Sequence, residues 1–126
     1  MDRIDIHLEV PRVDFQKLSS VQIGESSATI RARVEIAREI QRQRFMDNAA
    51  VTCNSEMRPA EIRKFCKLDA DGDRFMRAAM DRFQFSARVY HRLLKLSRTI
   101  ADLNHDSEIR SECVAEALQY RPKRTD

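Results

Sequence analysis

Apolar and polar side chains alternate from Ile4 to Val10, and Pro11 follows them. The apolar positions of this pattern are Ile4, Ile6, Leu8 and Val10. A period of two predicts a half-buried strand over residues 1–10. No second pattern of this kind occurs downstream, and a lone strand leaves a row of backbone N–H and C=O groups unpaired. The pattern therefore predicts an orphan strand whose sheet lies elsewhere.

Further along the chain, apolar residues recur at steps of three and four, which is the spacing of amphipathic helices. The predicted helices are 27–45, 59–66, one that begins after Asp69 or Asp71 and reaches Phe83, 86–103, and about 111–120. Ser26 or Ser27 and Ser86 are suited to cap helix N-termini, and Pro59 to begin a helix. We expect a mainly α protein, a bundle of about five helices preceded by one orphan N-terminal strand.

The first long helix is predicted to bury one apolar face along its whole length. The residues of that face are Ile30, Val34, Ala37, Ile40 and Phe45. In the helix 86–103, apolar residues at the same spacing predict a second core stripe. Scarce Gly (2) and Pro (3) agree with a helical domain in a chain of 126 residues.

Composition narrows the functional classes only slightly. The net charge is +3, from 23 basic and 20 acidic residues, which fits a well-mixed, ion-paired helical surface better than a dedicated DNA-binding face. Most of the basic residues are Arg, the side chain best suited to bidentate phosphate or carboxylate contacts. The three Cys residues are widely spaced, and we expect reduced thiols in a cytoplasmic protein with no membrane span.

The sequence motifs do not predict a metal site, and they do not predict catalysis by this chain alone. The run DADGD begins like a calcium loop at Asp69, but position six is Arg74 and position twelve is Met80. A calcium loop needs Gly and Glu at those positions, so an acidic helix start explains the run better. The Cys and His residues show no zinc spacing, and two glycines cannot build a phosphate-binding loop.

Arg88 is the one charged residue whose position is unusual. With Ser86 as the N-cap, Arg88 falls in the first turn of its helix, where a cation opposes the helix dipole. Arginine beside helix N–H groups can bind phosphate, and Arg92 and Lys95 continue the same basic stripe. An exposed Arg paired with a nearby carboxylate explains the spacing equally well. Arg3, at the start of the strand, reads by itself as a strand-end charge.

Four blocks of sequence together resemble a known family. DRIDIHLEVPRV, GESSATIRARVEIAREIQRQRF, FSARVYHRLLKLSRTIADL and IRSECVAEALQYR occur in the order found in the C-terminal part of the ComM/YifB proteins. Those proteins are magnesium-chelatase-like ATPases of the AAA+ class. The resemblance extends from about Asp2 to Arg121. It concerns the ancestry of the ATPase unit and does not imply metal insertion.

The resemblance implies a division of the chain into four parts. These are residues 1–10 as the last strand of an absent nucleotide-binding core, 11–25 as a linker, 26–121 as the helical lid, and 122–126 as a basic tail. The Walker A and B segments would lie upstream of residue 1, so this piece alone would be inactive. ATP and Mg²⁺ would be cofactors of the parent protein, and this part would bind neither tightly.

The resemblance also assigns roles to two arginines. Arg88 matches the sensor-2 arginine, which contacts the terminal phosphate of the nucleotide. Arg3 matches the place of an arginine finger, which stabilises transition-state charge at a neighbouring subunit's site. The same position would also suit a structural pair of Arg3 with Asp2 or Asp5.

The partners that follow from the resemblance are the upstream AAA+ core of the same chain, neighbouring subunits of a ring, expected to be a homo-hexamer, and DNA reached through the parent protein. The ComM branch acts on branched DNA during natural transformation. The alternative from another class is a free-standing helical adaptor that binds nucleic acid or a protein partner through its Arg-rich faces. The orphan strand favours the lid, because an adaptor gains nothing from an unpaired edge.

Overall fold

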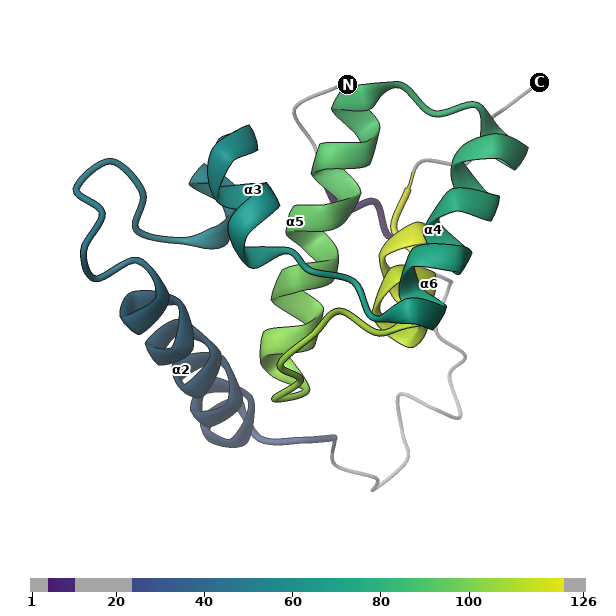
Figure 1. Cartoon of the computed structure of the whole chain (residues 1–126). Coiled ribbons are helices and arrows are strands. Elements are labelled where there is room, and N and C mark those ends of the chain that lie inside the picture. Colours follow the sequence, from purple (N-terminus) through teal and green to yellow (C-terminus); the bar gives the residue numbers. More distant parts are fainter. Residues whose placement is uncertain (1–4, 11–23, 122–126) are drawn as a thin grey trace, which may run out of the picture.

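The computed structural model describes residues 5–10 and 24–121 (Figure 1). Within that part the chain is helical, as predicted. The elements are α2 (Ser27–Arg44), the short 3₁₀ helix η1 (Asn54–Glu56), α3 (Pro59–Phe65), α4 (Ala70–Phe83), α5 (Ala87–Leu103) and α6 (Ser111–Gln119). The five predicted α-helices are confirmed to within one or two residues at each end. The 3₁₀ turn was not predicted.

Local capping explains where the helices begin. Ser26, Asp69 and Ser86 precede α2, α4 and α5, and each side-chain oxygen accepts a hydrogen bond from the backbone N–H three residues later. Such caps satisfy backbone donors that the helix itself leaves unpaired. Pro59 is the first residue of α3, a position where its missing N–H costs nothing.

Helix α5 is the centre of the domain, and α2, η1, α3 and α6 pack around it, with α4 resting on α6 (Figure 1). The core contains Leu93, Leu94, Ile100 and Ala101 of α5. Opposite them lie buried residues of the other helices, among them Met76, Ala79, Val114 and Ala117. Burial of large aliphatic side chains at roughly 1.5–3 kcal/mol each supplies the main driving force for this arrangement.

Only the C-terminal half of α2 belongs to the core. Ala37 and Phe45 are buried there, whereas Ile30 and Val34 are 45% and 44% exposed. The prediction of one apolar face buried along the whole helix was therefore wrong for its first two turns. Helical periodicity gives the direction of an apolar face, but the length of the surface opposite decides how much of that face is covered.

A buried ionic network joins α2, η1 and α5. Asp102, which is 1% exposed, accepts two hydrogen bonds from the guanidinium of Arg44, at 2.8 and 2.6 Å. It also accepts bonds from Asn54 Nδ2 at 2.8 Å and from Arg98 Nε at 3.2 Å. The rest of the Arg98 head donates to backbone carbonyls, including that of Asp106 at 2.6 Å. The buried carboxylate is thus fully paired, which is the condition for tolerating charge in a core.

A close backbone contact fixes the start of α4. Asp69 N–H donates to the carbonyl of Ile109 at 3.0 Å, and Ile109 N–H donates to the carbonyl of Lys67 at 2.9 Å. A Cβ on Gly72 would lie 2.6 Å from the Ile109 carbonyl oxygen. Glycine is required here because no side chain fits between the helix and the segment before α6.

The predicted N-terminal strand is not present in the described residues. Residues 5–10 form no strand, and within the described part of the chain His7 N–H donates a backbone hydrogen bond to the carbonyl of Tyr120 at 2.7 Å. A strand needs a neighbouring strand to complete its ladder, and no strand lies beside this segment among the described residues. Residues 1–4, the predicted linker apart from 24–25, and the tail 122–126 lie outside the described residues.

The network around Asp102 predicts a large cost of truncation. We expect Asp102→Ala to lower the free energy of unfolding by about 3–5 kcal/mol, because two arginines would lose their buried counter-charge. Urea unfolding followed by circular dichroism measures this. Glu39→Ala is the control, since it removes the exposed pair with Arg42 and is expected to leave the free energy of unfolding nearly unchanged. Similar values for both variants would contradict the central role of Asp102.

Candidate functional site

The N-terminus of α5 carries the residue that the sequence singled out. Ser86 caps the helix by accepting a hydrogen bond from Val89 N–H at 3.3 Å. Arg88 is exposed in the first turn, and that turn contains no acidic residue. The first turns of α3, α4 and α6 each contain Asp or Glu, as the helix dipole favours. The first turn of α5 therefore differs from the first turns of α3, α4 and α6, because it carries Arg88 and no acidic residue.

Arg88 lines a cleft of about 360 Å³ between α5 and the start of α3. The other residues lining it are Asp5, Met57, Pro59, Ile62, His91, Arg92 and Lys95. Arg88, Arg92 and Lys95 lie at steps of four and three, which puts them on one side of α5. The opposite side of the helix faces the core. The basic stripe predicted from sequence thus lines a real concave surface.

Arg92 and Lys95 are held by contacts within the described part of the protein. Arg92 Nε lies 2.9 Å from Asp5 Oδ1, and Lys95 Nζ donates to the backbone carbonyl of Ser55 at 3.3 Å. These contacts limit the freedom of long side chains that would otherwise be mobile. Asp5 was not foreseen as a member of the site, because nothing in a linear sequence relates it to Arg92.

The donor set of this cleft suits an anion. Arginine and lysine heads beside a helix N-terminus are the groups that bind phosphate oxygens, so the terminal phosphate of a nucleotide fits. Mg²⁺ does not fit, because among the described residues Asp5 is the one carboxylate lining the cleft. More broadly, no three Cys, His, Asp or Glu residues within 5–10 and 24–121 are arranged to hold a metal ion.

The acidic run at the start of α4 has structural roles. Asp69 is the N-cap, while Asp71 and Asp73 pair with Arg74 and Arg77 on the same helix. This agrees with the reading of the run as an acidic helix start. The other predicted site residue, Arg3, lies outside the described residues.

The cysteines do not provide a nucleophile in the core. Burial raises the pKa of the Cys66 thiol to about 11, an effect only partly opposed by the nearby Arg98 and Arg44 charges. Burial also raises the pKa of Cys113. Both side chains are therefore neutral thiols at physiological pH, and a neutral thiol is a poor nucleophile.

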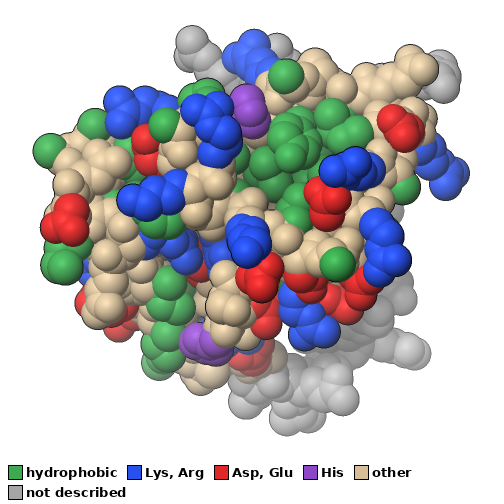
Figure 2. Space-filling model, viewed as in Figure 1, with side chains coloured by type: hydrophobic (Ala, Val, Ile, Leu, Met, Phe, Trp, Pro, Cys, Tyr) green, Lys and Arg blue, Asp and Glu red, His purple; other side chains and the backbone are tan. Residues whose placement is uncertain are grey.

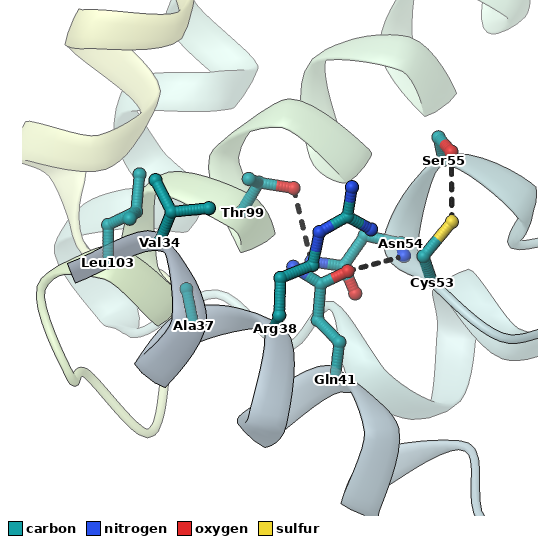
Figure 3. A pocket seen from close by; sticks show the side chains of 9 residues that line it. All are labelled: Val34, Ala37, Arg38, Gln41, Cys53, Asn54, Ser55, Thr99 and Leu103. Atoms are coloured by element: carbon teal, nitrogen blue, oxygen red, sulfur yellow. Dashed lines mark hydrogen bonds between the residues drawn. The ribbon is translucent and has the colours of Figure 1, made fainter. Parts of the chain in front are cut away.

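A second hollow, of about 310 Å³, lies between α2 and α5 (Figure 3). Gln41 Oε1 accepts from the Asn54 N–H at 2.9 Å, and Asn54 Nδ2 donates to Thr99 at 3.1 Å (Figure 3). These polar groups satisfy one another and continue into the Asp102 network. We therefore interpret this hollow as part of the packing interface between α2 and the rest of the domain.

A third hollow, between α4 and α5, has Met76, Met80 and Tyr90 among its lining residues. Apolar side chains gather on the visible face between these two helices, with charged groups around them (Figure 2). Fewer Arg and Lys residues line this hollow and the hollow between α2 and α5 than line the basic cleft. None of the described helices has the length and apolar character needed to cross a membrane.

Comparison with known proteins identifies the family. The profile of the family "Magnesium chelatase, subunit ChlI C-terminal" matches residues 24–121, and the chain belongs to this family. It also resembles curated proteins along nearly its whole length. It is 39% identical to the competence protein ComM of Haemophilus influenzae and 37% identical to YifB of Escherichia coli, over 96% of this chain in each case.

A less similar relative also matches nearly the whole length of this chain. The chain is 30% identical over 96% of its length to the uncharacterized protein Mb2921c of Mycobacterium bovis. It spans only 23% of the length of the ComM and YifB relatives and 24% of Mb2921c. The resemblance to the C-terminal domain of the ComM/YifB proteins predicted from sequence is thus confirmed.

The raised pKa of Cys66 predicts a pH dependence of stability. The folded-state pKa, about 11, exceeds the ordinary value of 9.0, so the unfolded chain loses this proton first as pH rises. The stabilisation is complete below pH 9 and is lost between pH 9 and about 11. We expect the wild type to lose on the order of 2 kcal/mol more than Cys66→Ala over this range in urea unfolding. Parallel pH profiles would contradict the assignment.

Proposed function

We propose that this chain is the lid of a magnesium-chelatase-like AAA+ ATPase, and that Arg88 is its sensor-2 arginine. The observation that carries the proposal is the position of Arg88, exposed in the first turn of α5 and lining a cleft with three further basic groups, His91, Arg92 and Lys95. The membership of the magnesium chelatase C-terminal family supports it.

In this proposal the lid closes over ATP bound to the upstream core. Arg88 contacts the terminal phosphate and stabilises the negative charge that develops on it during transfer. Arg92 and Lys95 add positive potential to the cleft. Mg²⁺ would be held by other residues, since the described residues that line the cleft include a single carboxylate. The lid depends on the core for turnover.

The parent protein would be a ring, expected to be a homo-hexamer, in which each site lies between subunits. In that ring Arg3 acts as an arginine finger at the neighbouring subunit's site. We further propose that hydrolysis drives remodelling of DNA in the cytoplasm. The support for this step is the similarity to a relative named a competence protein and the resemblance to the ComM branch.

Substitution of Arg88 tests the lid assignment directly. In the full-length protein we expect Arg88→Ala to reduce the ATPase kcat by about 100-fold or more, because a charge that stabilises the transition state is lost. The thermal unfolding midpoint of the 126-residue chain is expected to stay the same, since the side chain is exposed.

The matched control is Arg77→Ala, which removes an exposed arginine of α4 that pairs with Asp73. This variant is expected to keep wild-type turnover. A normal ATPase rate in Arg88→Ala would rule out the sensor-2 role, and a shifted unfolding midpoint would mean that Arg88 stabilises the fold instead.

Arg3→Ala in the full-length protein tests the arginine finger. Hydrolysis is expected to fall by about 1,000-fold or more while nucleotide affinity is retained, since a finger acts on transition-state charge. Steady-state kinetics and equilibrium binding of a fluorescent ATP analogue measure the two quantities. Loss of binding together with hydrolysis would indicate a structural role for Arg3.

A further inference from the structure

The N-terminal segment 5–10 contacts the helical domain through the side chain of Asp5 and the backbone of His7. Asp5 pairs with Arg92 of α5, and His7 N–H donates to the carbonyl of Tyr120 after α6. Ile6, Leu8 and Val10 are 48%, 71% and 83% exposed. Asp5 and Glu9 are exposed as well, and His7 is the half-buried residue of the segment. The segment therefore touches the domain at a few points and leaves its apolar side chains open to solvent.

In the Asp5–Arg92 pair the arginine is more buried than in a comparable surface pair. Arg92 Nε and Asp5 Oδ1 are 2.9 Å apart, and the Arg92 side chain is 24% exposed. The Arg77–Asp73 pair has the same separation, but the Arg77 side chain is 79% exposed. The carboxylates of the two pairs are about equally exposed, at 50% for Asp5 and 47% for Asp73, so the two pairs differ in the burial of the arginine. A less exposed Arg92 has fewer alternative positions in which to leave Asp5.

The contact also acts close to Arg88. Arg92 follows Arg88 by four residues, which places the two side chains one turn apart on the same side of α5. A helix is stiff over one turn, so fastening Arg92 to the segment fixes where Arg88 lies relative to that segment. Asp5 is in addition the one carboxylate among the described residues that line the basic cleft.

We infer that Asp5 and Arg92 are positioning residues that link the N-terminal segment to the lid and thereby place Arg88 for catalysis. The inference rests on the proposed function, in which the segment continues from the ATPase core. Arg92 then acts through Arg88, and Asp5 acts through Arg92. When the segment and the lid move together, the phosphate contact of Arg88 is kept in register with the core.

Amide hydrogen exchange in the 126-residue chain tests the link without any ATPase activity. In Arg92→Gln and in Asp5→Ala, exchange of the His7 N–H is expected to become roughly two- to fivefold faster, the effect of losing one partly exposed ion pair. The double variant is expected to match the single ones, because both remove the same contact. Arg77→Gln is the control and leaves His7 unchanged. Unchanged His7 exchange in Arg92→Gln overturns the inference.

Kinetics of the full-length protein test the consequence. Arg92→Gln and Asp5→Ala are each expected to lower kcat on the order of 10-fold with a smaller change in KM, and the double variant to be no worse. Arg92→Lys, which keeps the charge, restores part of the loss. Normal kcat in Arg92→Gln overturns the inference while the proposed function stands. A wild-type protein without ATPase activity overturns the proposed function and the catalytic role of the pair together.

Discussion

The carboxylate of Asp102 is the group on which the arrangement of the domain depends. It collects hydrogen bonds from Arg44 at the end of α2, from Asn54 of η1 and from Arg98 of α5 itself. A buried charge is stable only when it is completely paired, so the three segments can meet in only one relative position. Apolar packing would tolerate small shifts of α2 along α5, but the bidentate contact of Arg44 does not. The network therefore specifies the geometry around α5 as much as it stabilises it.

Helix α5 serves two purposes on opposite sides. Leu93 and Ile100 face the core, and Arg88 and Arg92 face the basic cleft. Because packing and the Asp102 network fix the buried side, the cations on the other side have defined positions along and around the helix axis. An anion that enters the cleft meets charges that are already in place, so little reorganisation is needed. Helix α5 thus contributes both to the stability of the domain and to the proposed binding of phosphate.

The sequence predicted the helices well because their signals are local. A cap such as Ser86 and an apolar period are readable within a few residues of each other. The Asp102 network was not predictable in the same way. Arg98 and Asp102 have the spacing of an ordinary surface pair, and only the tertiary fold shows that they are buried. Likewise, the period of α2 gave the right face but could not tell that Ile30 and Val34 extend past the surface that covers Ala37.

The same limit explains the N-terminal segment. Alternation from Ile4 to Val10 predicted a half-buried strand, but residues 5–10 form no strand in this structure. Asp5 and the backbone N–H of His7 contact the helical domain, and Ile6, Leu8 and Val10 are exposed. An apolar stripe of this kind is stabilised when a second surface covers it. Under the proposed function that surface belongs to the nucleotide-binding core, so the segment would contact the core through Ile6, Leu8 and Val10 and the lid through Asp5.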